Sequence, residues 1–191
     1  YNMFGINLSM PYKQAVIPYL DDLTESARLI GAVNTVLHQD GLLIGHNTDG
    51  IGFFKSLETL RAFHVRNKRL TILGGGGAST AIIAQAAIDG AKEITIFCRP
   101  QSVERTVATV QTIAQSTGVS LQVLPNNDSQ LLAEHINNSD LLINGTSVGM
   151  DGTSLPLPAT IRFPEELLVA DVIYQPFETP LLKMANSQGN P

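Results

Sequence analysis

Four consecutive glycines, Gly74, Gly75, Gly76 and Gly77, are the residues of this sequence best suited to chemistry. They join a short apolar strand, predicted at residues 69–74, to an alanine-rich helix predicted at residues 78–90. Glycine lacks a Cβ atom, so its backbone can turn tightly and approach a phosphate closely. The first turn of the following helix adds free N–H groups and the positive end of the helix dipole. The pattern predicts a phosphate-binding turn, although four glycines alone also suit an ordinary tight turn.

The spacing of the glycines approaches the G-x-G-x-x-G/A fingerprint of dinucleotide-binding turns. Gly74 and Gly76 occupy its first two positions, while Ser79 occupies the third. The close packing of helix on strand would then fall to Ala78 or Ala81, both of which are small. Because the turn also lies between a strand and a helix, as such a site requires, we expect it to bind a dinucleotide.

The end of the next predicted strand, residues 93–98, bears on the choice of cofactor. An NAD-specific site usually has an acidic residue there for the ribose 2′-hydroxyl. This strand ends at Cys98 and is followed by Arg99, and Glu104 lies inside the next predicted helix. A guanidinium at this place suits a 2′-phosphate or stacks on adenine, which favours NADP. The alternative is a surface arginine with no role in binding.

Three polar residues upstream could act on a substrate. Lys13 lies between a predicted strand, residues 4–10, and a predicted helix, residues 11–23, while Asp49 precedes an amphipathic run at residues 51–63. A carboxylate at a helix start is stabilised in its charged form by the helix dipole, so the position of Asp49 would suit an acid/base group. Each residue also has a simpler explanation: Lys13 as a solvated surface lysine, Thr48 or Asp49 as a helix cap, and Asn34 as a hydrogen-bonding residue of a hairpin.

The elements that must position these residues fall into two groups. Before residue 68, Asp40-Gly41 between two apolar runs predicts a β-hairpin, and a short helix at residues 24–30 ends at Gly31. After residue 68, apolar strands alternate with helices, which predicts a parallel sheet covered on both faces. We expect strands at residues 93–98, 120–125, 140–145 and 167–176. Ligands of such sheets bind at the carboxyl ends of the strands, where Thr146, Ser147 and Tyr174 are expected.

Composition narrows the classes of function. The 191 residues are 43% apolar and 15% charged, with a formal net charge of −5. Nucleic acid and anionic membrane are therefore poor partners, and no apolar run is long enough to cross a bilayer. The single cysteine fits a reducing compartment, so we expect a cytoplasmic location. No pair of histidines has the spacing of metal ligands, so we expect no metal. Both termini look unlike natural domain boundaries, and we expect a chain that lacks both ends.

Six stretches together resemble the shikimate dehydrogenase family, including its quinate/shikimate branch. They are GINLSMPYK, GAVNTV, GHNTDG, LGGGGAS, NGTSVGM and DVIYQPFETPLL, in the order of the family. The resemblance implies an α/β protein in which part of an N-terminal α/β substrate domain, residues 1–48, precedes a Rossmann-like domain, residues 49–180. Residues 181–191 would begin a helix that returns to the substrate domain. The implied reaction is the reversible reduction of 3-dehydroshikimate to shikimate with NADPH, in the chorismate and aromatic amino-acid pathway.

The resemblance also assigns residues. Lys13 matches the catalytic lysine of the family and Asp49 its partner, and the substrate-binding positions are Ser9, Lys13, Asn34, Asp49 and Tyr174. The cofactor-binding positions are Gly74, Gly75, Gly76, Gly77, Ala78, Arg99, Thr146 and Val172.

Two departures from the family pattern leave alternatives open. An upstream segment with serines and a downstream helix with a glutamine are both missing, so we expect an incomplete substrate pocket. Biosynthetic NADP enzymes commonly have Asn-Arg-Thr where this chain has Cys98-Arg99-Pro100, and the quinate/shikimate branch accepts NAD or NADP. Quinate as a substrate, NAD as a cofactor, a homodimer and a non-catalytic regulator with the same fold therefore stay open.

Overall fold

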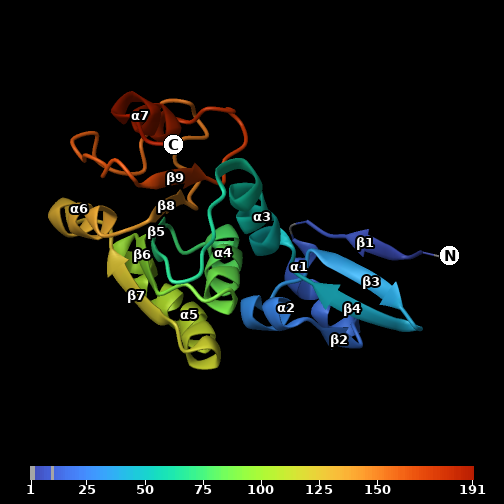
Figure 1. Ribbon diagram of the computed structural model, residues 1–191. Coiled ribbons are helices and arrows are strands. Elements are labelled where there is room, and N and C mark those ends of the chain that lie inside the picture. Colours follow the sequence, from blue (N-terminus) through green and yellow to red (C-terminus); the bar gives the residue numbers. More distant parts are fainter. Residues whose placement is uncertain (1–2, 10) are drawn as a thin grey trace.

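The computed structural model describes residues 3–9 and 11–191, which form two sheets connected through helices (Figure 1). The first sheet has four strands in the order β1-β3-β4-β2, and the second has five in the order β7-β6-β5-β8-β9. All neighbouring strands of the second sheet run parallel. The predicted α/β class with a Rossmann-like parallel sheet is confirmed.

The N-terminal sheet is built around the predicted hairpin. β3 (Thr35–Gln39) pairs antiparallel with β4 (Leu42–His46), and the turn residues Asp40 and Gly41 both have positive φ, 52° and 84°. β1 (Gly5–Asn7) pairs antiparallel with β3, and β2 (Asp22–Leu23) pairs parallel with β4. A small core is formed by Ala27 of α2 (Glu25–Ile30) with Val33 and Val36, and residues that follow α1 (Tyr12–Ala15), among them Val16 and Leu20, pack against it.

The C-terminal sheet is a series of strand–helix units. Its elements in chain order are β5 (Arg69–Leu73), α4 (Gly77–Ile88), β6 (Glu93–Cys98), α5 (Val103–Thr117), β7 (Ser120–Pro125), α6 (Ser129–Asn137), β8 (Leu141–Asn144), β9 (Leu168–Asp171) and α7 (Pro180–Gln188). The strands β5, β6, β8 and β9 are mostly buried, as the strands of a parallel sheet covered on both faces should be, while the edge strand β7 is only partly buried.

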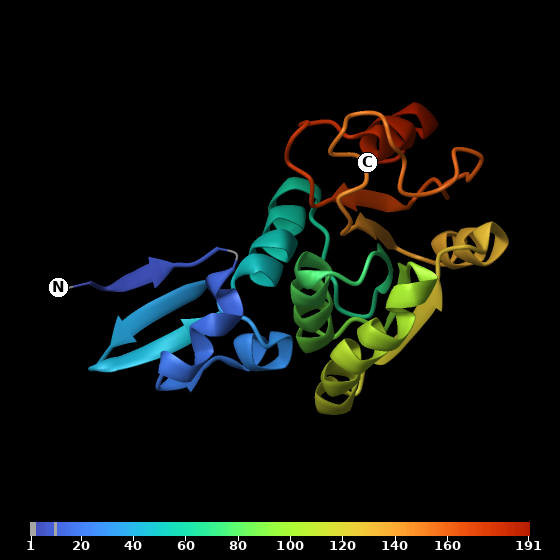
Figure 2. The same cartoon turned by 180° about the vertical axis from the view of Figure 1, so that it is seen from behind.

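Alternate residues of these strands enter two apolar cores. Leu141 and Ile143 of β8 face a core formed with α3 (Asp49–Arg61), α4 and α5, while Leu142 between them faces a core formed with α6 and α7. Both views of the ribbon show helices on each side of the sheet (Figures 1 and 2). This two-sided packing fixes the carboxyl ends of the strands, where the glycine turn lies.

Two helices join the sheets. α3 follows β4 directly and packs on α4, with Gly50 at the contact, because a Cβ there would lie 2.7 Å from the Cβ of Gln85. α2 belongs to the N-terminal sheet, yet its Leu29 and Ile30 pack against the core under α4 and α5. Figure 2 shows the N-terminal sheet attached through these helices and otherwise extending away.

Three predicted elements are shorter than expected. The predicted helix at residues 11–23 is only α1, followed by a 3₁₀ turn, Ile17–Tyr19, because Pro18 lacks an N–H group and its ring blocks a continued α-helix. The predicted strand at residues 167–176 ends at Asp171, whose carboxylate accepts the N–H of Ile173 and turns the chain. Met10, the last residue of the first predicted strand, lies outside the described residues, and β1 ends at Asn7.

Candidate active site

The glycine turn opens into a pocket at the carboxyl ends of β5, β6 and β8. The chain proceeds from β5 to β6 and β7 on one side, then crosses to β8 on the other side of β5. Ligands of open α/β sheets bind at such a reversal of strand order. The pocket measures about 350 Å³, and its walls include Gly74, Gly75, Gly76, Arg99 and Thr146.

The backbone of the turn is shaped by close contacts. Gly74 has a φ of +96°, and a Cβ there would lie 2.7 Å from Cγ2 of Thr146. At Gly76, by contrast, a Cβ would meet nothing within 4 Å, so this part of the turn is open to a ligand. Ser79, at the third fingerprint position, is buried and donates its hydroxyl to the carbonyl of Gly145 at 3.3 Å. The serine therefore joins helix α4 to the loop after β8.

Two arginines belong to the wall of this pocket. Arg99 follows β6, as predicted, and Arg105 on α5 lines the same pocket. Both side chains are exposed, and neither has an ion-pair partner within the described part of the chain. Arg105 was missed by the sequence analysis, although its place on the helix that follows Arg99 could have indicated it. Two unpaired guanidinium groups suit a bound phosphate.

Lys13, Asn34 and Asp49 meet in a second group of polar residues. Lys13 Nζ lies 2.8 Å from Asp49 Oδ2, and Asn34 Nδ2 donates to Asp49 Oδ1 at 2.7 Å. The N–H of Thr48 donates to Asn34 Oδ1 at 3.0 Å, so the asparagine holds both the carboxylate and the backbone before it. The Lys13 and Asp49 side chains are 30% and 42% exposed, which leaves both accessible to a small molecule.

The helix-cap alternative fails for these side chains. Thr48 is the N-cap of α3, but its side chain makes no capping hydrogen bond. Its hydroxyl instead lies 3.1 Å from Asn34 Nδ2, and the carboxylate of Asp49 is shared between Lys13 and Asn34. Lys13 lies in α1, Asn34 directly precedes β3 and Asp49 begins α3, so separate elements assemble this cluster, which we call the acid/base group after its expected role.

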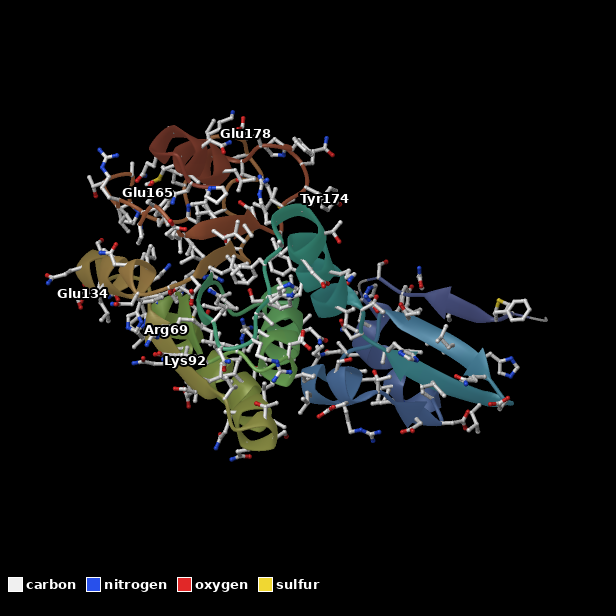
Figure 3. The ribbon with its side chains drawn as sticks, in the orientation of Figure 1. Arg69, Lys92, Glu134, Glu165, Tyr174 and Glu178 are labelled. Atoms are coloured by element: carbon white, nitrogen blue, oxygen red, sulfur yellow. The ribbon has the colours of Figure 1, made fainter. Side chains whose placement is uncertain are left out.

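The other predicted site residues lie apart from this group. Ser9 is exposed, and its carbonyl accepts the N–H of Tyr12 at 2.9 Å. Tyr174 is 88% exposed on the loop after β9, on the side facing the N-terminal sheet (Figure 3). Gly77 and Ala78 form the first turn of α4, and Val172 packs against the core beneath α3. Within the described residues, no side-chain hydrogen bond or ion pair connects these residues to Lys13 or Asp49.

Hydrogen bonds lower the pKa values of two aspartates, Asp151 and Asp140. Hydrogen bonds from the side chain and N–H of Ser154, and from the N–H of Thr153, lower the pKa of Asp151 to about 2. Asp140 is partly buried, which opposes its ionisation, but the N–H of Arg69 and the Lys68 ammonium outweigh this and lower its pKa. Among residues 3–9 and 11–191, no group of three or more His, Cys, Asp or Glu is placed to hold a metal ion, and no helix is long and apolar enough to span a membrane.

Comparison with known proteins gives one family. Residues 1–36 match the model of the shikimate dehydrogenase substrate binding domain. The chain is 82% identical over all 191 residues to a protein of Streptococcus suis named shikimate dehydrogenase (NADP(+)), of which it covers 66%. It spans slightly less than two thirds of the length of the curated relatives it matches.

Solved structures agree with this similarity. A shikimate 5-dehydrogenase from Listeria monocytogenes, in complex with shikimate and NAD, matches 99% of this chain with a TM-score of 0.92 and 41% identity. A quinate dehydrogenase from Corynebacterium glutamicum, in complex with NAD, matches 99% with a TM-score of 0.85 and 29% identity. The chain covers 66% of each of these structures.

Proposed function

The chain belongs to the shikimate dehydrogenase family, and we propose that the whole protein interconverts 3-dehydroshikimate and shikimate with NADP as cofactor. The observation that carries this proposal is the Lys13–Asp49 ion pair, held by Asn34 at the start of α3. A surface lysine and a capping aspartate would not need a third residue to orient the carboxylate toward the lysine. The similar protein from S. suis is named for this reaction, which supports the assignment.

Substrate binding and cofactor binding would fall to different parts of the chain. Residues 1–48 would carry the substrate-binding part, with Ser9, Lys13 and Asn34, and residues 49–180 the dinucleotide-binding part. Residues 181–191, where α7 packs on the C-terminal sheet, would lead the chain back toward the substrate part. Tyr174 would reach the substrate from the C-terminal side, because its loop faces the N-terminal sheet.

Lys13 and Asp49 would handle the proton of the reaction. Reduction of a ketone to a secondary alcohol requires a hydride and a proton, and bound NADPH supplies the hydride. The Lys13 ammonium would donate the proton to the carbonyl oxygen as negative charge develops there, then regain one from water. In the oxidation of shikimate the neutral amine would accept the hydroxyl proton. Asp49 would orient the lysine and accept a hydrogen bond from a substrate hydroxyl.

The residues of the pocket suit a dinucleotide phosphate. The open space at Gly76 lets a phosphate approach the backbone, and Gly77 and Ala78 offer free N–H groups at the start of α4. Thr146 and Val172 would border the other end of the cofactor. Arg99 and Arg105 would bind the 2′-phosphate that distinguishes NADP from NAD. We expect Arg105→Gln to weaken NADPH binding while leaving NADH binding nearly unchanged.

Replacement of the lysine tests the reaction itself. In the full-length protein, Lys13→Ala should lower the turnover of shikimate with NADP by orders of magnitude, because the proton donor is lost. NADPH binding, followed by nucleotide fluorescence, should survive. Lys55→Ala is the matched control, since Lys55 pairs with Glu58 within α3 and should leave turnover unchanged. Unchanged turnover in Lys13→Ala would refute the proposal.

A second candidate reaction is the oxidation of quinate with NAD or NADP. Pro100 follows Arg99 here, where the biosynthetic NADP enzymes of the family commonly have threonine, and the quinate dehydrogenase of C. glutamicum shares the fold at a TM-score of 0.85. Values of kcat/KM for shikimate and quinate, each measured with both cofactors, would decide between the two. A non-catalytic regulator would bind these ligands without changing nucleotide absorbance.

A further inference from the structure

Asn144 and Asp171 form a pair at the carboxyl ends of β8 and β9. The two residues are direct neighbours in the sheet, and Asn144 is fully buried. Asn144 Nδ2 lies 3.1 Å from both Asp171 oxygens, Oδ1 and Oδ2. Each strand ends at this pair and continues as a loop, so the pair joins the starting points of two loops.

Asn144 fixes the first loop, residues 145–148. Its Oδ1 accepts the N–H and the hydroxyl of Thr146, at 3.1 and 2.7 Å, and its Nδ2 donates to the carbonyl of Val148 at 3.1 Å. Every residue of this loop lines the cofactor pocket. Through Thr146 the loop also packs against Gly74, so it contacts the glycine turn directly.

Asp171 fixes the second loop, residues 172–179. Its Oδ1 accepts the N–H of Ile173 at 3.0 Å, and its Oδ2 accepts the hydroxyl of Thr179 at 2.7 Å. Thr179 is fully buried and caps α7 through the N–H of Leu182 at 3.4 Å. Both ends of the loop that carries Tyr174 are therefore held by one carboxylate.

The residue after the first loop, Gly149, also lies close to the second loop. A Cβ on Gly149 would lie 3.5 Å from Cδ1 of Ile173 and 3.6 Å from Cδ of Pro180. An unbroken series of contacts thus leads from the glycine turn through Thr146, Asn144 and Asp171 to the Tyr174 loop. A carboxylate that served only as a local turn or helix cap would not need a donor from the neighbouring strand, where Asn144 in turn holds the first loop.

We propose that Asp171 is a positioning residue that couples cofactor binding to substrate binding, by holding the cofactor loop 145–148 and the Tyr174 loop 172–179 in one arrangement. This inference rests on the proposed function, because it takes the two ligands to be NADP and shikimate. A cofactor that orders the first loop then also orders the second. Less conformational entropy is lost when the substrate binds afterwards. Positive coupling between two ligands follows from shared ordering of this kind.

The test measures shikimate binding to the full-length protein by calorimetry, with and without saturating NADPH. Shikimate and NADPH are both reduced, so no hydride transfer disturbs the ternary complex. We expect NADPH to tighten shikimate binding in the parent by about fivefold or more. In Asp171→Asn, the amide N–H₂ would face either the Asn144 amide or the Thr179 hydroxyl, so the ratio of the two affinities should fall to about one.

A second pair of variants separates coupling from folding. Thr179→Val removes the hydroxyl that Asp171 accepts and should reduce the coupling, while Thr179→Ser keeps the hydroxyl and should restore it. If Asp171 had only a structural role, its substitution would lower thermal stability and weaken the binding of both ligands. The ratio of the shikimate affinities with and without NADPH would then stay the same. If Asp171→Asn fails to fold, the Thr179 variants give the answer.

The possible outcomes are distinct. Coupling that is present in the parent and absent in Asp171→Asn and Thr179→Val supports the inference. If the parent binds both ligands without coupling, the inference is wrong while the proposed function stands. The same holds if the parent shows coupling and the variants show it equally. If the parent binds neither NADPH nor shikimate, the proposed function is wrong and this inference falls with it.

Discussion

Replacement of Gly74 by alanine should cost far more stability than the same change two residues later. Gly74 has a φ of +96°, a conformation that costs an L-residue about 1–2 kcal/mol. The added Cβ would also lie 2.7 Å from Cγ2 of Thr146, and such overpacking costs about 1–3 kcal/mol. The free energy of unfolding should therefore fall by about 2–5 kcal/mol in Gly74→Ala.

Gly76→Ala is the matched control. Gly76 has a φ of −83°, and a Cβ there would meet nothing within 4 Å, so its free energy of unfolding should change by less than about 1 kcal/mol. The new methyl group would instead occupy the open side of the turn, so NADPH should bind more weakly. The pair of variants thus separates the structural role of one glycine from the binding role of another.

The two costs at Gly74 can be measured separately by urea-induced unfolding of a double mutant. Thr146→Ser removes Cγ2 but keeps the hydroxyl that Asn144 accepts. In the double mutant with Gly74→Ala, this change should relieve the steric overlap, so the two substitutions should show an interaction energy of about 1–3 kcal/mol. Only the cost of the positive φ would then remain. Equal unfolding midpoints for Gly74→Ala and Gly76→Ala would refute this reasoning.

Three further predictions address the core, the acid/base group and acid stability. Ile96→Ala, at a fully buried position of β6, should lower the free energy of unfolding by about 2–5 kcal/mol, measured with urea. Asn34→Ala removes the 2.7 Å hydrogen bond to the Asp49 carboxylate, so kcat/KM of the full-length protein should fall about 10- to 100-fold, as for a lost bond to a charged group; an unchanged value would contradict the role given to Asn34. Asp151 has its pKa lowered from 3.8 to about 2, so its contribution to stability is present above pH 3.8 and is lost as the pH falls toward 2. In a pH series of thermal unfolding, the difference in melting temperature between the parent and Asp151→Asn should shrink across that window.

Elements fixed by local chemistry could be predicted from the sequence. Asp40-Gly41 specifies a hairpin because both residues tolerate positive φ, and Gly31 ends α2 in the left-handed conformation for the same reason. The apolar strands after residue 68 specify a parallel sheet because both of their faces are buried. The glycine turn and Arg99 follow from this topology and from their places at the ends of strands.

The tertiary contacts of individual side chains could not be predicted from the neighbouring sequence. Asp49 has the sequence context of a helix cap, and only the approach of α1 and β3 directs Lys13 and Asn34 to its carboxylate. Arg105 lines the pocket because α5 begins close to the carboxyl end of β6. Asp171 looked like the middle of a buried strand, yet its hydrogen bonds to Ile173 and Thr179 end the strand there.

The contact of α2 with the C-terminal core has a consequence for distant residues. Leu29 and Ile30 lie far along the chain from Arg99 and the glycine turn, yet they anchor the N-terminal sheet against the helices that carry that turn. With α3, this contact gives the N-terminal sheet a second attachment, which opposes its rotation about a single connection. The distance between Lys13 and the pocket therefore depends on how the two sheets are held together, and the apolar contacts of α2 and α3 help to maintain it. Substitutions at Leu29 or Ile30 would alter the reaction rate without touching either ligand.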